Sequence, residues 1–185
     1  MREAYKILDT QGFIHRTKHG TYVKGIDDIA RQGNFLASLE LADKREMVEF
    51  VCALEPGAVF LAAKKIDEEG LKELEKLMIA CEKAVDDSKE LLKKNYQFHA
   101  YIRELADNNL ITSALTAYYD IFNQQIIENI YAWYNNIDEF KMKSLEQHRE
   151  LFDALKNNDA EKAKKIAHIH LFDDIEVHEL KHKDN

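Results

Sequence analysis

Residues 145–171 constrain the fold more than any other part of the sequence. The segment reads LEQHRELFDALKNNDAEKAKKIAHIHL, and its pattern predicts two helices joined by a tight turn at residues 157–159. Asp159 is a good N-cap for the second helix, and the two asparagines before it tolerate the unusual dihedral angles of such a turn. The segment therefore predicts an antiparallel helix hairpin.

Two histidines take equivalent places in this hairpin. His148 lies eleven residues before Asp159, and His170 lies eleven residues after it. In an antiparallel hairpin, equal distances from the turn put both residues at the same height, about 16 Å from the turn at the rise of an α-helix. Two imidazoles can then face each other inside a bundle, which is the arrangement that a bound metal ion requires.

The rest of the composition also favours helices. The chain has 6 glycines and 1 proline in 185 residues, so long stretches have little to interrupt regular structure. The apolar runs are too short to span a membrane, and the charged N-terminus does not match a signal peptide. Cys52 and Cys81 lie within helical patterns and predict free thiols in a reducing cytosol. We expect an all-α, cytoplasmic protein with no membrane segment.

The N-terminal residues differ in charge from the remainder. Residues 1–24 contain five Lys or Arg against two acidic residues, whereas the rest contains 21 against 32. Residues 1–11 predict a helix that ends before Gly12, and residues 13–16 and 20–23 predict a β-hairpin with a basic tip. A helix followed by a basic hairpin is typical of the second half of a winged helix-turn-helix, which binds DNA.

This N-terminal stretch resembles the recognition helix and wing of GntR-family bacterial transcription regulators. The family pattern is R-E-A-L-x-x-L-x-x-x-G followed by a wing that ends G-T-x-V, and the matching residues are Arg2, Glu3, Ala4, Leu8, Gly12, Gly20, Thr21 and Val23. The resemblance implies operator DNA as a partner, with contacts from Arg2, Lys18 and His19. The chain begins inside the third helix of that fold, so we expect the two preceding helices to be absent through truncation, a mis-assigned start or natural loss.

Beyond the wing, residues 25–42 predict a linker with one short helix around residues 27–32. From Asp43 helices follow one another almost without a break, and Pro56 is expected to kink or restart the first of them. Asp67 is the expected cap of the next helix. Further helices are expected at 88–106 and across 110–133, the latter as one bent helix or two.

The body of the chain resembles FCD, the ligand-binding domain of the largest GntR subgroup, which is an antiparallel helical bundle. The matching stretches are LEPGAVFLAA at 54–63, NYQFH at 95–99, LADNNLI at 105–111 and EQHRELFDALKNNDAEKA at 146–163. The resemblance implies a metal site at Asn95, His99, His148 and His170. Such a site suits Zn or Ni and leaves open positions for water or a ligand.

Two residues depart from the FCD pattern. Asn95 stands where a carboxylate is usual, and its neutral amide oxygen is a weaker metal ligand. Val51 stands where the subgroup commonly has an Arg that pairs with the carboxylate of an effector. Without that guanidinium, a small organic acid loses its bidentate partner on this helix.

The C-terminus contains a competing motif. Residues 178–182 match H-E-x-x-H, the signature of zinc metallopeptidases in which the Glu acts as general base. Only three residues follow, so no third ligand is available downstream, and the motif predicts a solvated tail. A ferritin-like di-iron carrier is excluded because it needs two Glu-x-x-His segments on separate helices.

The sequence thus predicts a non-enzymatic, homodimeric GntR-type regulator. Its expected parts are a partial winged helix at 1–24, a linker at 25–42 and an FCD-like bundle of six to seven helices at 43–185. The bundle is expected to bind a metal and a small-molecule effector such as an organic acid, and thereby to modulate DNA binding. The alternatives are an orphaned metal-binding domain that no longer binds DNA and, with less support, a hydrolase that uses the C-terminal motif.

Overall fold

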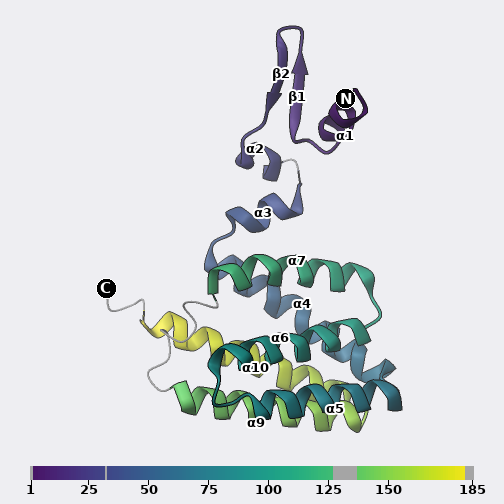
Figure 1. Cartoon of the computed structure of the whole chain (residues 1–185), viewed down its shortest axis with the longest axis vertical. Coiled ribbons are helices and arrows are strands. Elements are labelled where there is room, and N and C mark those ends of the chain that lie inside the picture. Colours follow the sequence, from purple (N-terminus) through teal and green to yellow (C-terminus); the bar gives the residue numbers. More distant parts are fainter. Residues whose placement is uncertain (1, 32, 127–136, 182–185) are drawn as a thin grey trace. The chain divides into compact units, whose positions relative to one another are not determined.

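The computed structural model describes residues 2–31, 33–126 and 137–181, and the contacts divide the chain into two compact units, residues 1–47 and 48–185. Figure 1 labels the elements of each unit. None of the described helices is both long enough and apolar enough to cross a lipid bilayer.

The first unit contains a short helix and a two-stranded hairpin. Helix α1 (Arg2–Thr10) is followed by Gly12 at a φ of 79°, a conformation that glycine adopts without steric cost. Strands β1 (Ile14–Thr17) and β2 (Gly20–Val23) pair antiparallel, with Ile14 opposite Val23. The helix and the hairpin expected from the sequence are both present.

The expected linker contains more regular structure than the sequence analysis predicted. Helix α2 (Ile26–Arg31) corresponds to the predicted short helix, but a second helix, α3 (Phe35–Leu41), follows it. Asn34 caps α3, since its side-chain oxygen accepts a hydrogen bond from the backbone N–H of Ala37 at 3.1 Å. The prediction of one helix in this stretch was therefore wrong.

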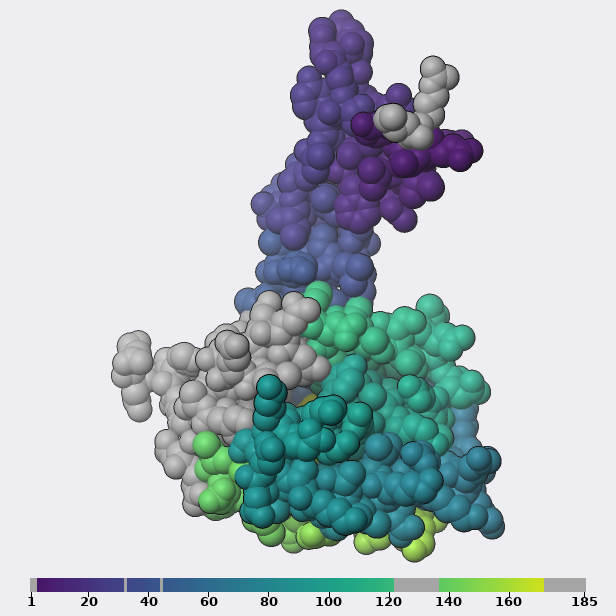
Figure 2. Space-filling model, in the orientation of Figure 1, coloured from purple at the N-terminus to yellow at the C-terminus, as the bar shows by residue number. Residues whose placement is uncertain are grey.

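The second unit is an antiparallel bundle, which confirms the predicted all-α fold class. Its described helices are α4 (Lys44–Lys65), α5 (Glu68–Lys83), α6 (Ser88–Leu105), α7 (Asn109–Ile126), α9 (Ile137–Lys156) and α10 (Ala160–Lys181). Helix α5 packs against α6 and α9, α6 packs against α7, and α9 packs along α10. Figure 2 shows α5, α6 and α7 closely packed on the face it presents. The expected continuation of α7 to residue 133 lies outside the described residues.

Helix α4 passes through Pro56 without a restart. A kink or a new helix was expected there, because proline lacks the N–H that bonds to the preceding turn. The helix nevertheless runs from Lys44 to Lys65. Ala58, Val59 and Ala62 in the turns after Pro56 are fully buried, so packing of these turns offsets the one lost hydrogen bond.

The helix hairpin has the predicted turn. Helix α9 ends at Lys156 and α10 begins at Ala160, and Asn158 adopts a positive φ of 53°. The Asp159 carboxylate accepts a hydrogen bond from the backbone N–H of Lys162 at 3.0 Å, so Asp159 is the N-cap of α10. His148 and His170 occur in the buried stripes of the two helices, in line with the core residues Leu155 and Ala163.

Candidate metal centre

Three histidines from three helices converge inside the bundle. His99 comes from α6, His148 from α9 and His170 from α10, and each is at least nine-tenths buried. Their ring centroids are 4.9–5.2 Å apart, and one ring nitrogen from each lies within 4.8 Å of the others. The structure thus brings together the three imidazoles that the sequence placed in one site.

The spacing of the ring nitrogens is close to that of a metal-bound set. Zn–N bonds of about 2.0–2.1 Å in a tetrahedron separate neighbouring nitrogens by about 3.4 Å. The Nε2 atoms of His99 and His148 are 3.0 Å apart, and the third imidazole is within the 4.8 Å limit. Two of the three rings therefore already lie at about the separation that a tetrahedral ion sets.

Partners on the far side of two rings aim Nε2 at the centre of the cluster. The Nδ1 atom of His170 lies 2.7 Å from Oε1 of Gln147, and Nδ1 of His99 lies 3.1 Å from Oε1 of Glu55. Each oxygen favours the tautomer in which Nδ1 carries the proton and Nε2 carries the free lone pair. This is the arrangement by which proteins commonly orient histidine ligands of metals.

His148 is the most deeply buried member of the cluster. Burial lowers the pKa of His148 well below its ordinary value, and the nearby His170 and His99 lower it further. The ring therefore stays neutral at physiological pH and keeps a lone pair for a metal. Its Nδ1 has no hydrogen-bond partner among the described residues.

Asn95 lies four residues before His99 on the same face of α6. Its Oδ1 atom is buried and has no hydrogen-bond partner among the described residues. A buried amide oxygen without a donor is uncommon in folded proteins. The unpaired oxygen is compatible with the expected role of Asn95 as a neutral ligand, because a bound cation would supply the missing partner.

A charged group that the sequence did not predict lies beside the cluster. Glu55 of α4 is 2% exposed, and it accepts a short hydrogen bond from the Tyr119 hydroxyl of α7. Burial alone raises the pKa of Glu55, but His99, Arg103 and Tyr119 outweigh burial and hold it below its usual range. Burial and the Glu55 charge raise the pKa of Tyr119 well above its ordinary value, so the phenol remains a donor.

The other predicted site residues lie elsewhere. Lys18 and His19 are exposed at the tip of the β-hairpin, and His168 is exposed on α10 as expected. Arg2 is the first residue of α1. Helix α10 extends through positions 178 and 179 of the H-E-x-x-H motif, whereas His182 lies outside the described residues.

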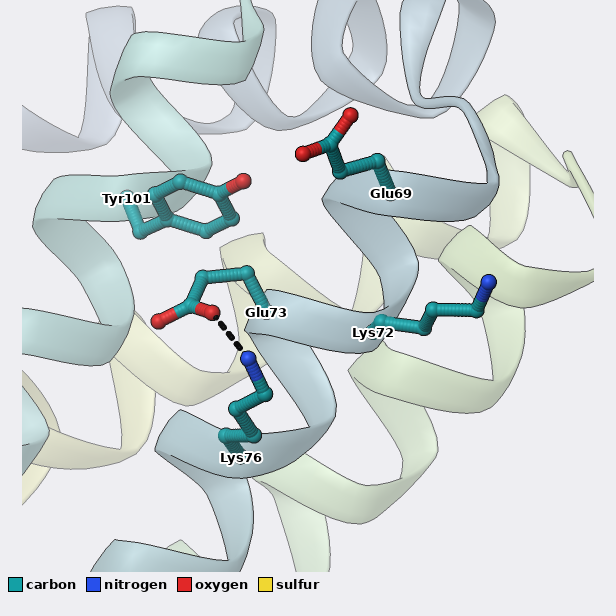
Figure 3. A pocket seen from close by; sticks show the side chains of 5 residues that line it. All are labelled: Glu69, Lys72, Glu73, Lys76 and Tyr101. Carbon is teal, nitrogen blue, oxygen red and sulfur yellow. Dashed lines mark hydrogen bonds and ion pairs between the residues drawn. The ribbon is translucent and has the colours of Figure 1, made fainter.

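A hollow on the surface of α5 and α6 shares no residue with the histidine cluster. It is lined by Glu69, Lys72, Glu73, Lys76 and Tyr101, and Figure 3 shows the Glu73–Lys76 ion pair within it. Two carboxylates and two ammonium groups balance one another there. The hollow therefore lacks the buried, unpaired groups that distinguish the cluster.

Comparison with known proteins relates the chain to transcription regulators. The family model described as "FCD domain" matches residues 46–173. The chain is 32% identical over 183 residues to the uncharacterized HTH-type transcriptional regulator YcbG of Bacillus subtilis, covering 95% of this chain and 70% of that protein. It is 28% identical over 185 residues to the HTH-type regulator YdhC of the same organism, covering 98% and 74%.

Two solved structures share the architecture. Escherichia coli McbR/YncC superimposes with a TM-score of 0.65 at 18% identity, covering 96% of this chain and 82% of the other. Streptococcus agalactiae GntR superimposes with a TM-score of 0.57 at 27% identity, covering 92% and 78%. The first of these similarities concerns the fold alone.

Proposed function

This chain belongs to the FCD-domain family of GntR-type transcriptional regulators, and from that premise we propose that its helical unit is a metal-dependent sensor. A divalent transition metal, Zn or Ni, binds to His99, His148 and His170, with the Asn95 amide oxygen as a fourth ligand. A small-molecule effector binds beside the metal and changes the affinity for operator DNA. The family assignment confirms that the protein is a regulator and not an enzyme.

The observation that carries the proposal is the convergence of three buried imidazoles, two of which have a side-chain oxygen beside Nδ1. Glu55 lies beside Nδ1 of His99 and Gln147 beside Nδ1 of His170, which favours metal binding through Nε2 of these rings. Three neutral histidines suit a borderline-soft divalent metal, which would supply Lewis acidity and an open coordination position for a ligand. Glu55 supplies the negative charge beside the site.

Metal analysis of histidine variants tests this proposal. Purified wild-type protein is expected to hold about one equivalent of Zn or Ni after reconstitution and dialysis, whereas His99→Ala, His148→Ala and His170→Ala are each expected to lose it. His168→Ala is the matched control, because it removes an exposed imidazole from the same helix as His170. Metal content unchanged in all three cluster variants contradicts the proposal.

A truncation separates this site from the C-terminal motif. Removal of residues 178–185 deletes both histidines of H-E-x-x-H and leaves the three cluster histidines in place. The truncated protein is expected to retain its metal. Loss of the metal would place the binding site in the tail instead.

We propose that operator contacts come from the N-terminal unit. Lys18 and His19 lie exposed at the hairpin tip, and the surrounding residues are basic, which supports binding to a polyanion. A gel shift with the DNA that flanks the gene is expected to weaken in Lys18→Gln and to weaken further as salt rises.

The proposed homodimer is tested by sedimentation of the purified chain.

A further inference from the structure

Arg103 of α6 is a buried cation, and two of its nitrogen atoms lack a hydrogen-bond partner in the part of the chain that the structure describes. Its side chain is 2% exposed, and its guanidinium carbon lies 4.3 Å from the ring centre of Tyr119. The Nε and Nη1 atoms are buried and have no hydrogen-bond partner among the described residues. Buried polar groups are nearly always hydrogen-bonded, and an unbonded charged group carries a larger desolvation cost than a neutral one.

Glu55 balances the charge of Arg103 but does not use these donors. Its Oε1 atom lies 3.9 Å from Nη1 of Arg103, which is too long for a hydrogen bond. The same oxygen is 3.1 Å from Nδ1 of His99, and Oε2 accepts the Tyr119 hydroxyl. Both oxygens of the carboxylate therefore lie closer to other groups than to Arg103.

The unused donors lie next to the histidine cluster. Arg103 follows His99 by four residues, and Asn95 precedes His99 by four, so all three occupy one face of α6. Arg103 and His99 also approach the same oxygen of Glu55. One helix face thus presents an unpaired acceptor at one end and unpaired cationic donors at the other.

We propose that Arg103 is the anion anchor of the effector site and that its free N–H groups bind the carboxylate of a small organic acid. A planar guanidinium matches a planar carboxylate, and the Tyr119 ring against it favours approach in that plane. The inference rests on the proposed effector site beside the histidines. It assigns the specificity for an anionic ligand to a residue of α6.

Arg103 would compensate for the absence of an arginine at Val51. Val51 is buried on α4, one helical turn before Glu55, and supplies no guanidinium. Arg103 reaches Glu55 from the neighbouring helix α6. The guanidinium expected from α4 is therefore supplied by a different helix, and the site keeps its preference for an anion.

Calorimetric titration of Arg103 variants tests the anchor. The metal-loaded protein is titrated with acetate and succinate, with the neutral diamide succinamide, and with inorganic phosphate. Wild type is expected to bind a carboxylate and not the diamide, and Arg103→Gln is expected to lower that affinity about 10- to 100-fold while the metal content stays unchanged. Arg149→Gln is the control, because it removes an exposed guanidinium from the same bundle.

The outcomes separate the anchor from the metal site. Three results would overturn the anchor. They are carboxylate binding by Arg103→Gln at wild-type affinity, binding of phosphate in place of carboxylate, and the absence of any response of the wild type to either acid. If the reconstituted wild-type protein holds no metal, only the proposed metal site is overturned. The same titrations on the metal-free protein still test Arg103. Arg103→Lys keeps the charge beside Glu55 but loses the planar fork. It is expected to weaken carboxylate binding about 10-fold, and it decides the matter if Arg103→Gln does not fold.

Discussion

Replacement of Glu55 by Gln tests the charge balance beside the histidine cluster. The substitution keeps the shape of the side chain and removes its negative charge. Glu55 is 2% exposed and lies 3.9 Å from Nη1 of Arg103, which is equally buried. Loss of the carboxylate charge leaves the Arg103 cation without compensation in the interior.

The structure sets the size of the effect. Two unit charges 3.9 Å apart attract by about 4 kcal/mol at an effective dielectric constant of about 20. Removal of one partner from a buried ion pair costs about 3–5 kcal/mol, which agrees with that figure. We therefore expect Glu55→Gln to lower the free energy of unfolding of the metal-free protein by about 3–5 kcal/mol. Since Glu55 also orients His99, metal affinity is expected to fall about 10- to 100-fold.

Urea unfolding with a matched control measures this difference. Glu82 and Arg149 form an ion pair with a shorter separation of 2.6 Å, but both side chains are partly exposed. Glu82→Gln is expected to cost under about 1 kcal/mol because solvent screens the pair. If Glu55→Gln lowers the free energy of unfolding no more than Glu82→Gln does, burial does not determine how much these ion pairs contribute to stability, and the reasoning is refuted. The double variant Glu55→Gln/Arg103→Gln is expected to cost less than the sum of its parts, because no unpaired charge remains.

Three further predictions concern single residues. Asn95→Asp is expected to raise Zn affinity about 10-fold or more in a chelator competition, because a carboxylate is a stronger ligand, and to destabilise the metal-free protein by about 1–3 kcal/mol. The lowered pKa of His148 means that the unfolded chain gains a proton below pH 6.5 that the native ring does not take up. The metal-free protein should therefore lose up to about 1.4 kcal/mol per pH unit as pH falls through that range, and urea midpoints of His148→Gln should show a smaller slope. Burial raises the pKa of Cys81 to about 11, so in a Cys52→Ser background iodoacetamide should modify the native protein slowly at pH 8 and the denatured protein quickly.

The features predicted from the sequence are those encoded by local spacing. The turn before Asp159 depends on residues that are adjacent in the chain, and the cap follows from the chemistry of one carboxylate. His148 and His170 are equally spaced from that turn, so the helix rise alone puts them at the same height. The two rings are indeed 4.9 Å apart. His99 was reached through a family resemblance, because no local pattern links α6 to the hairpin.

The features that the sequence analysis missed depend on competition between local and tertiary effects. Helix α3 had a usable signal in Asn34, an N-cap residue directly before Phe35. The absence of a restart of α4 at Pro56 had none, because the buried residues that support the helix there are recognised only after the bundle is assembled. Local propensity is a weak guide wherever packing supplies the larger free energy.

The partners of the ligands are harder to predict than the ligands themselves, and they decide what the site accepts. Glu55 comes from α4, His99 and Arg103 from α6, and Tyr119 from α7, so their contact depends on how three helices pack. A signal did exist in the spacing of Arg103, which follows His99 by one helical turn. What this spacing indicates depends on Glu55. If that carboxylate accepted hydrogen bonds from the Arg103 guanidinium, no donor would remain for a ligand. Since that carboxylate serves His99 and Tyr119 instead, one buried acid both orients a metal ligand and leaves a cation available, and a change at Glu55 must alter both properties together.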